Sequence, residues 1–501
     1  MIDALIEGFF LVLEWPAVGY MCVGILFGLF MGFTPGIGGP VTLALVLPFV
    51  FGLNEVSAVA FLLGTHSVVV TGGSVTAILF GVPGAGPNAA TIIDGYPMAQ
   101  KGEAGRAIGA ALTASALGGL LGTLILALLI PILRPLVLVF GPPEFFMLAI
   151  LGVVFLATLS GDEPLKGVVA GLFGLMLSLI GEEQLMGTKR YSFGLLYLWD
   201  GIKLVPAVIG LFAIAEMVDL LLRGGSIAKT DQQSSTMGPW TGVQDVFKRW
   251  GLFLRSSIVG VVIGIIPGLG GDVACFLAYG QAAQTAKKGE VPYGKGNVGG
   301  VIAPEAANNA KEGGALVPTI AFGIPGSGSM AILLGALLIV GITPGAPLLN
   351  EKLNITFAMV WTLAIANVLG AAVMFLLANK LSKITFLEGS LIAPIVLSIC
   401  FIGAYMTTNS IGDIIVALVL GFIGFEMKRL NYSRAALLLG LVLGRIVEQN
   451  LFLSLRLFGG SFAVRPITLV LIVISVLVLG WSFLKPWLWR KEQNNASGSQ
   501  A

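Results

Sequence analysis

The residues best suited to bind a ligand form a run of glycine and proline that occurs twice. Residues 32–41 read GFTPGIGGPV and residues 264–273 read GIIPGLGGDV, each inside a strongly apolar stretch. Proline and glycine free backbone groups from helical pairing, and hydrocarbon holds no water to satisfy those groups. Such a break is stable only where it lines a cavity or contacts something. Two breaks at matching positions of two halves predict a transport site at the interface between repeats.

Each PGxGG sequence is expected to end one half-helix and begin another, because proline is tolerated in a first helical turn and glycine lets the backbone approach a ligand closely. The bare amides at the new N-terminus and the helix dipole, roughly half a positive charge, attract anions such as a carboxylate. The alternative is that these residues only permit kinks and close helix packing. The expected substrate-binding residues of the breaks are Gly36, Gly38, Gly39, Gly268, Gly270 and Gly271.

A second pair of proline-glycine segments, rich in small polar residues, follows the breaks. Residues 71–95 read TGGSVTAILFGVPGAGPNAATIIDG, and residues 303–329 read APEAANNAKEGGALVPTIAFGIPGSGS. The halves are therefore copies, with about ten extra residues in the second copy, within 287–312. Hydroxyls and amides suit both carboxylate oxygens and a dehydrated Na⁺, although the hydroxyls can also bond only to their own helix backbone. The expected substrate-binding residues here are Gly72, Gly73, Ser74, Thr76, Pro83, Gly84, Asn88, Thr91, Asn308, Asn309, Pro325, Gly326, Ser327 and Ser329.

Three ionisable residues in or near these segments are candidates for ion coupling. Asp94 and Glu305 could bind a cation or a proton, or could instead cap helices at the membrane surface. His66 is the only histidine of the chain. An intramembrane histidine is either a proton carrier or a neutral imidazole hydrogen-bonded within the bundle. No arginine lies in the four motifs, and Lys311 is the nearest basic residue.

The elements that position these residues must lie in a membrane. Hydrophobic residues make up 56% of the 501 residues, charged residues 11%, and the mean hydropathy is +0.96, whereas a soluble domain has about 25% charged residues. Since one span needs about 20 apolar residues, we expect an all-α polytopic membrane protein of about 10–12 transmembrane helices with broken or re-entrant segments. A soluble enzyme with a grafted anchor is excluded.

Other classes of site and partner find little support. Cys22, Cys275 and Cys400 lie singly in apolar runs, so we expect neither a disulfide framework nor a metal site. The net charge is only +2, and the basic residues are scattered among loops, which argues against a nucleic-acid partner.

Catalysis is not indicated either. GLGGDV and GSGSMA have glycine spacings like those of nucleotide loops but lack GK[ST]. Ser74, His66 and Asp94 could be assembled as a hydrolase triad, yet nothing in their spacing selects one. We therefore expect that the chain is not an enzyme and has no cofactor other than a coupling ion.

The apolar runs and polar stretches predict five parts of the chain. These are a first transmembrane repeat (1–222), a cytoplasmic linker (223–250), a second transmembrane repeat (251–465), a final transmembrane helix (466–489) and a disordered cytoplasmic tail (490–501). Lys485, Arg490 and Lys491 predict a cytoplasmic C-terminus by the positive-inside rule. The distribution of Lys and Arg among the loops further predicts that the two repeats insert with opposite orientation.

Six motifs, in order, carry a resemblance to a known family. They are PGIGG, TGGSVTAILFGVPG, AATIIDGYPMAQKGEAGRA, PGLGG, APEAANNA and GIPGSGS, and the match covers most of residues 20–480. The chain resembles the large membrane (permease) subunit of the tripartite tricarboxylate transporters, the TctA family. It departs from the family pattern at Thr71, where an aromatic residue is frequent, and at PGAGPN, which replaces a more usual PGT or PGE segment. These departures bear on the substrate and the coupling ion.

The resemblance implies a secondary transporter of a bacterial or archaeal cell (inner) membrane, driven by Na⁺ or H⁺. It also implies an extracytoplasmic solute-binding protein that delivers the carboxylate and a small four-span membrane subunit. We therefore predict a carboxylate symporter whose site is built from the two breaks and the two polar segments. The alternatives are a passive channel for small organic anions and an intramembrane enzyme.

Overall fold

The computed structural model describes residues 1–34, 36–159, 163–183, 187–223, 238–287, 289–381 and 389–480. Helices make up most of this part of the chain. Strands β1 (Gly181–Glu182) and β2 (Lys189–Arg190) pair antiparallel as a short hairpin. The predicted class, a helical polytopic membrane protein, is confirmed, and within the described residues this hairpin is the one departure from an all-α fold.

Membrane-spanning helices of several lengths occur among the described residues. Five are long and apolar enough to cross a bilayer alone: Glu55–Phe80, Ala104–Leu138, Leu204–Leu222, Leu353–Leu377 and Arg434–Val464. A bent pair of helices, α1 (Ile2–Leu13) and α2 (Ala17–Phe33), passes the same test together, with a bend of 69°. Further apolar helices of 10–17 residues are shorter than the roughly 20 residues that one span needs. Short helices of this kind are what interrupted spans produce.

The helices form two compact units. Unit 1 comprises Met1–Val137 and Val205–Phe425, and unit 2 comprises Leu138–Leu204 and the chain from Glu426 onward. Each unit therefore takes residues from both expected repeats. All the predicted site residues belong to unit 1.

Unit 2 contains α7 (Pro142–Leu159), α8 (Pro164–Ser178), the hairpin, η3 (Leu196–Asp200), α19 (Arg434–Phe458), η6 (Gly459–Val464) and an apolar helix at Pro466–Gly480. Glycines bring α8 and α19 into close contact, because a Cβ on Gly174 would overlap the carbonyl oxygen of Leu437. The buried Glu144 carboxylate accepts hydrogen bonds from Arg465 Nε (2.9 Å) and Thr468 Oγ1 (2.8 Å). These contacts hold the unit together and contain none of the predicted site residues.

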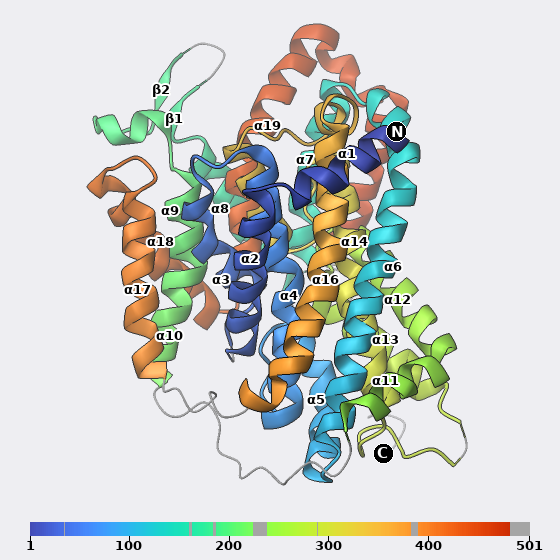
Figure 1. Cartoon of the computed structure of the whole chain (residues 1–501). Coiled ribbons are helices and arrows are strands. Elements are labelled where there is room, and N and C mark those ends of the chain that lie inside the picture. Colours follow the sequence, from blue (N-terminus) through green and yellow to red (C-terminus); the bar gives the residue numbers. More distant parts are fainter. Residues whose placement is uncertain are drawn as a thin grey trace, which may run out of the picture. The chain divides into compact units, whose positions relative to one another are not determined.

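Unit 1 is built from two series of helices that can be followed in Figure 1. The first half supplies α1, α2, α3 (Gly39–Val46), η1 (Leu47–Val50), α4 (Glu55–Phe80), η2 (Gly86–Asn88), α5 (Ala89–Gln100) and α6 (Ala104–Leu138). The second half supplies α11 (Pro239–Lys248), α12 (Trp250–Ile265), α13 (Gly270–Gln284), α14 (Gly299–Phe322), α15 (Gly328–Ile339), η5 (Pro347–Glu351), α16 (Leu353–Leu381), α17 (Gly389–Tyr405) and α18 (Ile411–Arg429). Between them lie α9 (Leu204–Val208), the π-helical turn η4 (Ile209–Ile214) and α10 (Ala215–Arg223).

The two series repeat the same local geometry. Helix α2 packs on α4 and α12 packs on α14 through glycines: a Cβ on Gly28 would overlap the Thr65 carbonyl, and one on Gly260 would overlap the Ala307 carbonyl. Gly81 (φ 65°) is the C-cap residue after α4, and Gly323 (φ 66°) is the C-cap residue after α14. A φ in this left-handed region favours glycine. The sequence repeat is therefore also a repeat of backbone structure.

Helices α4 and α14 cross the middle of unit 1 side by side and run in opposite directions. Their facing side chains make three contacts, Ser74–Glu305, Thr71–Asn309 and His66–Glu312, in which the residue number falls along α4 as it rises along α14. All six side chains are buried. We call these three contacts the polar seam.

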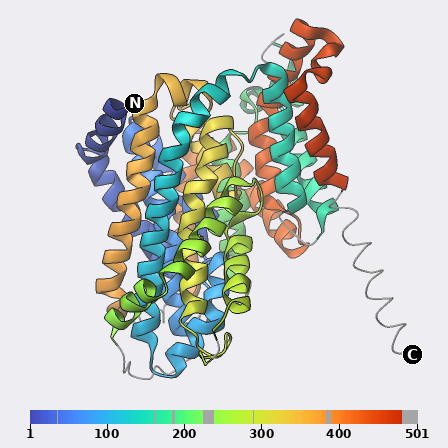
Figure 2. The same cartoon turned by 90° about the vertical axis from the view of Figure 1, so that its right-hand side faces the viewer.

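Each central helix is also covered by a long helix from the other half. A Cβ on Gly118 of α6 would overlap the Ala306 carbonyl of α14, and a Cβ on Gly370 of α16 would overlap Val68 of α4. Figures 1 and 2 show α6, α14 and α16 side by side. The centre of unit 1 is therefore made by both halves.

Some predicted parts lie outside the described residues. Within the expected linker 223–250, residues 224–237 lie outside them, and α11 and the start of α12 lie inside. The expected final helix 466–489 is described as far as Gly480, and the expected tail 490–501 lies outside. The basic residues used to predict a cytoplasmic C-terminus are also outside, so that orientation stays a prediction.

Candidate functional site

Each PGxGG sequence ends one helix and begins another. At the first break α2 ends at Phe33 and α3 begins at Gly39, and at the second α12 ends at Ile265 and α13 begins at Gly270. Gly36 N donates to Pro83 O (3.4 Å), and Gly268 N donates to Gly326 O (3.2 Å). Both donors have a positive φ, 80° and 84°. The break and the proline-glycine segment of one half are therefore joined by a backbone hydrogen bond.

Each break also lies against the proline-glycine segment of the other half. A Cβ on Gly39 would lie 2.7 Å from Ser329 Oγ, and a Cβ on Gly271 would lie 2.7 Å from Pro87 Cγ. Asp272, which follows the second break, approaches Gly86 so closely that a Cβ there would lie 2.5 Å from its Oδ1. The four motifs thus meet in one region of unit 1.

A buried chain of ionisable groups lies where the two breaks meet. His66 Nε2 is 2.9 Å from Glu312 Oε2, and Lys311 Nζ is 2.6 Å from Glu312 Oε1. The exposed fractions of His66, Lys311 and Glu312 are 3%, 5% and 1%. A Cβ on Gly39 would lie 3.5 Å from His66 Nδ1, and a Cβ on Gly271 would lie 3.2 Å from Lys311 Nζ. The His66–Glu312–Lys311 chain therefore connects one break to the other.

The His66–Glu312–Lys311 chain contains a positive charge with which a carboxylate could form an ion pair. Lys311 is the one buried lysine or arginine in the part of the chain that the structure describes. A buried charge is stable only when it is paired, and here Glu312 is the partner. An incoming carboxylate has the same chemistry as Glu312 and could take its place on Lys311.

Two further polar groups in or beside the His66–Glu312–Lys311 chain have no hydrogen-bond partner among the described residues. They are His66 Nδ1 and the side-chain amide of Asn308, of which neither the nitrogen nor the oxygen is bonded. Asn308 is buried and precedes Lys311 by three residues, which places both on the same side of α14. Buried polar groups are normally satisfied. Groups left without a partner at such a position are available to a ligand.

The amide nitrogen of Asn309, by contrast, belongs to the scaffold, whereas Asn309 Oδ1 has no hydrogen-bond partner among the described residues. Its Nδ2 donates to Thr71 Oγ1 (3.0 Å) and to Asn367 Oδ1 (2.6 Å), and Asn367 Nδ2 donates to Leu363 O (2.8 Å). This network links α4, α14 and α16. Thr71, at which the sequence departs from the family pattern, therefore has a packing partner.

Glu305 is the centre of a cluster of neutral donors. Its Oε2 accepts from Ser74 Oγ (2.6 Å) and Ser115 Oγ (2.9 Å), and its Oε1 accepts from Thr91 Oγ1 (2.5 Å) and, at 3.5 Å, from Asn88 Nδ2. All five side chains are buried. The structure therefore brings together Glu305, Ser74, Asn88 and Thr91, which the sequence singled out separately.

Asp94 lies in a different environment. Its Oδ1 accepts from Gly296 N and Asn297 N (both 2.8 Å), and its Oδ2 accepts from Tyr279 OH (2.9 Å). It thereby holds the segment before α14, which carries the extra residues of the second half, against α5. Burial raises the pKa of the neighbouring Tyr293 phenol, further from physiological pH, at which an ordinary tyrosine is already neutral. Asp94 is buried but acts as a structural clamp.

The remaining predicted residues shape the backbone of the site. Thr76 Oγ1 donates to Phe33 O (2.8 Å), the last residue of α2, and Ser327 Oγ accepts from Met330 N (3.3 Å) as the N-cap of α15. Positions at which a Cβ would come within 3 Å of a neighbour are Gly72, Gly73, Gly84 and Gly326. Gly38 and Gly270 are different, because a Cβ at either would meet no atom closer than 3.8 Å. Pro325 lies buried beside Gly326.

Sequence reasoning missed Glu312, Asp272, Ser115 and Asn367 as parts of this region. Glu312 could have been found, because it lies seven residues after Glu305 and so on the same face of a helix. Ser115 and Asn367 lie in long helices, α6 and α16, that carry no break. Only the packing of those helices on the centre of unit 1 shows that they take part.

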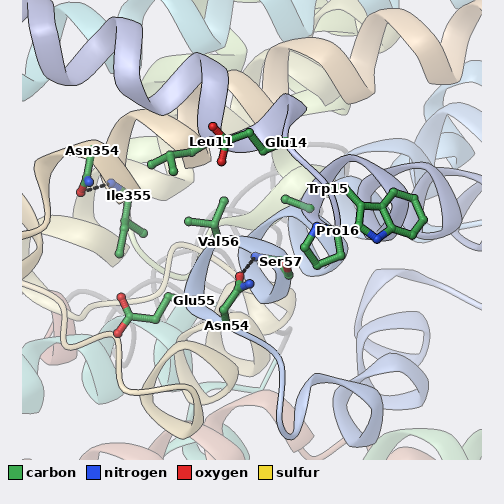
Figure 3. A pocket seen from close by; sticks show the side chains of 11 residues that line it. Leu11, Glu14, Trp15, Pro16, Asn54, Glu55, Val56, Ser57, Asn354 and Ile355 are labelled. Atoms are coloured by element: carbon green, nitrogen blue, oxygen red, sulfur yellow. Dashed lines mark hydrogen bonds between the residues drawn. The ribbon is translucent and has the colours of Figure 1, made fainter.

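A separate pocket of about 390 Å³ opens at the elbow between α1 and α2. Figure 3 shows Trp15 and Pro16 at this elbow, with Asn54 and Glu55 from the start of α4 and Asn354 and Ile355 from the start of α16. The Glu55 carboxylate is paired with Lys352 (2.5 Å). None of the residues predicted to bind substrate or ions lines this pocket.

Comparison with known proteins identifies the family. The profile of the tripartite tricarboxylate transporter TctA family matches residues 18–439. An Agrobacterium vitis protein named "Uncharacterized 52.8 kDa protein in TAR-I ttuC' 3'region" is 32% identical over 482 residues, which is 95% of each chain. A second A. vitis protein, "Uncharacterized protein in TAR-II ttuC' 3'region", is 28% identical over 221 residues, 44% of this chain and 91% of its own. No solved structure matches. The chain belongs to the tripartite tricarboxylate transporter TctA family, and is thus a multi-pass membrane subunit of a tripartite transporter.

Proposed function

We propose that the protein is a carboxylate:cation symporter whose substrate binds where the two breaks meet. The observation that carries this proposal is the approach of both breaks, and of the opposing proline-glycine segments, to the buried His66–Glu312–Lys311 chain. Two broken segments from matching halves that enclose ionisable groups are the arrangement of a secondary transporter site. Membership of a transporter family supports transport over catalysis.

A substrate carboxylate binds by replacing Glu312 on Lys311. An ammonium group forms charge-assisted hydrogen bonds with a carboxylate, and the glycines of the breaks let a ligand approach the backbone closely. The unpartnered groups of Asn308 and His66 supply further hydrogen bonds. Glu312 keeps Lys311 paired while substrate is absent, so that the lysine is not left as an isolated buried charge.

The coupling ion is Na⁺ or H⁺, and Glu305 is its carrier. The hydrogen-bond partners of the Glu305 carboxylate are the neutral side chains of Ser74, Asn88, Thr91 and Ser115. An ionised carboxylate in such a place is costly unless a cation or a proton neutralises it. A cation bound here therefore stabilises one state of the transporter, and its gradient can drive the cycle.

The opposite directions of α4 and α14, which are equivalent helices of the two halves, support an inverted repeat. Inverted repeats give a transporter two related conformations, open to either side of the membrane, around one central site. In the cell (inner) membrane the chain would work with an extracytoplasmic solute-binding protein, which delivers the carboxylate, and a small four-span membrane subunit. Its C-terminus would be cytoplasmic.

Uptake into sealed proteoliposomes tests the proposal. The chain is reconstituted with its partner subunits and supplied with a panel of radiolabelled di- and tricarboxylates. A symporter accumulates its substrate above the outside concentration, and the accumulation collapses when the ion gradient is dissipated. Equilibration without accumulation would show a passive channel, and chemical change of the solute would show an enzyme.

A further inference from the structure

The polar seam contains two carboxylates, one with a positively charged partner and one whose partners are all neutral. Glu312 contacts the ammonium group of Lys311. Glu305, seven residues earlier on the same helix, accepts hydrogen bonds from hydroxyl and amide groups only. A fully buried acid with neutral partners is either protonated or bound to a cation for part of the cycle. The hydrogen bonds around Glu305 show how its carboxyl group can be protonated without a change in its surroundings.

The hydroxyl of Ser74 has two possible acceptors. Its Oγ lies 2.6 Å from Glu305 Oε2 and 2.9 Å from the Val70 carbonyl oxygen. A serine hydroxyl has one hydrogen to donate and two lone pairs to accept with. When Glu305 is ionised, Ser74 donates to Oε2. When Glu305 is protonated at Oε2, the acid donates to Ser74 Oγ, and the serine hydrogen turns to Val70 O.

The other donors keep their partners in both states. Thr91 Oγ1 donates to Oε1 and Ser115 Oγ donates to Oε2 whether or not the acid carries a proton. Asn88 Nδ2 reaches Val70 O (3.0 Å) and Ser74 Oγ (3.1 Å). Both protonation states of Glu305 are therefore hydrogen-bonded with every heavy atom in the same place.

We propose that the coupling ion is a proton, that Glu305 carries it, and that the Ser74 hydroxyl changes acceptor as the proton arrives and leaves. The inference rests on the proposed symport function. One proton passes from water to Glu305 Oε2 on the side where substrate enters, and returns from Oε2 to water on the other side. No other bond is made or broken.

The titratable groups around Glu305 are compatible with this role. Cys275 of α13 lies near it, with Sγ donating at 3.4 Å to the carbonyl oxygen of Pro304, the residue before Glu305. Asp94 of α5 is engaged by two backbone amides and Tyr279. Helix α6 contributes Ser115, whose hydroxyl does not titrate at physiological pH.

Three other titratable residues lie along the central helices. Lys311 and Glu312 are about two turns further along α14 and pair with each other. His66 is about two turns before Ser74 on α4 and contacts Glu312. Among the described residues, no lysine or arginine side chain hydrogen-bonds or forms an ion pair with Glu305, so a proton on the acid can supply the neutralisation.

Gradient-driven uptake in the proteoliposomes described above tests this inference. The carboxylate that accumulates is offered under two conditions: a pH gradient, alkaline inside, with Na⁺ absent, and a Na⁺ gradient at equal pH. A pH-sensitive dye inside the vesicles records proton entry. We expect accumulation and proton entry with the pH gradient alone. Accumulation driven only by the Na⁺ gradient would overturn the proton inference and leave symport intact, whereas no accumulation under either gradient would overturn symport itself.

Two variants test whether Glu305 is the residue that carries the proton. Glu305→Gln is permanently neutral, so we expect it to lose pH-driven accumulation while still exchanging labelled for unlabelled carboxylate across the membrane. Unchanged pH-driven accumulation by Glu305→Gln would overturn the assignment. If that variant does not insert, Ser74→Ala decides instead. It should slow pH-driven uptake roughly three- to tenfold relative to exchange, the effect of one lost hydrogen bond.

Two hydroxyl variants of α6 serve as comparisons for Ser74→Ala. Ser115→Ala removes a donor but not the hydroxyl that changes acceptor, and should have the smaller effect. Thr123 Oγ1 bonds only to Gly119 O of its own helix (2.7 Å), so Thr123→Ala should match the wild type. Equal effects of Ser74→Ala and Thr123→Ala would contradict a role for the Ser74 hydroxyl.

Discussion

His66 Nε2 lies 2.9 Å from Glu312 Oε2, although 246 positions separate the two residues in the sequence. This contact joins α4 of the first half to α14 of the second at the point where both breaks approach. Through Glu312 it extends to Lys311. The contact makes one site out of two halves, and the following predictions test its parts.

Lys311→Met should abolish high-affinity binding of the carboxylate. Loss of a charge-assisted hydrogen bond weakens binding by about 1.5–3 kcal/mol, roughly 10- to 100-fold. The same change leaves His66 as the one charged or polar partner of the buried Glu312 among the described residues, and should destabilise the protein by up to about 3–5 kcal/mol. Substrate-induced thermal stabilisation of the purified protein measures both effects.

A double variant separates affinity from stability. Lys311→Met with Glu312→Gln leaves no isolated charge, so stability should recover while binding does not. Lys352→Met serves as the control, because Lys352 pairs with Glu55 beside the separate pocket. Recovery of binding in the double variant would contradict the role of Lys311.

Asn308→Ala should lower substrate affinity, whereas Asn309→Ala should lower stability. The Asn308 amide has no hydrogen-bond partner among the described residues, so its removal should leave stability unchanged or slightly higher while affinity for the carboxylate falls about fivefold, the effect of one hydrogen bond. Asn309 Nδ2 bonds to Thr71 and Asn367, so Asn309→Ala should lower stability by about 1–3 kcal/mol. Denaturation midpoints and binding isotherms distinguish them. Loss of stability in Asn308→Ala with unchanged affinity would refute its assignment as a ligand.

Gly271→Val should stop transport, whereas Gly280→Val should not. Both glycines lie on α13. A Cβ on Gly271 would lie 2.7 Å from Pro87 Cγ and 3.2 Å from Lys311 Nζ, whereas a Cβ on Gly280 would meet no atom within 4 Å. Uptake per inserted molecule is the measurement. Gly39→Val should behave like Gly271→Val, and wild-type uptake in either would show that the breaks do not form the site.

Asp94→Asn should loosen the segment before α14 without affecting substrate affinity. An amide in place of the carboxylate presents one oxygen and an NH₂ group to three donors, so contacts with Gly296 N, Asn297 N or Tyr279 OH are lost. Faster hydrogen exchange is expected at residues 289–298, together with an unchanged binding constant. A proton-coupling role for Asp94 would instead appear as loss of pH-driven accumulation with unchanged exchange protection.

The breaks and the ionisable residues could be predicted from the sequence, but not the way they pair. Proline and glycine at matching positions imply broken helices wherever the chain crosses hydrocarbon, so Gly39 and Gly271 were identified from local chemistry alone. The contacts Ser74–Glu305 and His66–Glu312 depend on α4 and α14 lying antiparallel. No periodicity within either helix specifies that register.

The same distinction explains the two carboxylates. Asp94 and Glu305 look alike in the sequence, since each is an acid among small residues with a proline within three positions. In the structure, backbone amides of another segment surround Asp94, whereas hydroxyls from three helices surround Glu305. The donors come from parts of the chain about 190 to 230 residues away, and local sequence carries no information about them.

The central claim is that both halves line one carboxylate site, and substrate protection of introduced cysteines tests it most directly. Gly38→Cys in the first break and Pro87→Cys, which faces Gly271 of the second, are made in a chain whose three cysteines are replaced, with Gly280→Cys as the control. The rate of modification by a small thiol reagent is measured against carboxylate concentration. The account predicts that the carboxylate slows modification at positions 38 and 87 with the same concentration dependence and leaves position 280 unaffected. Protection of only one of the two positions, or of neither, would contradict it.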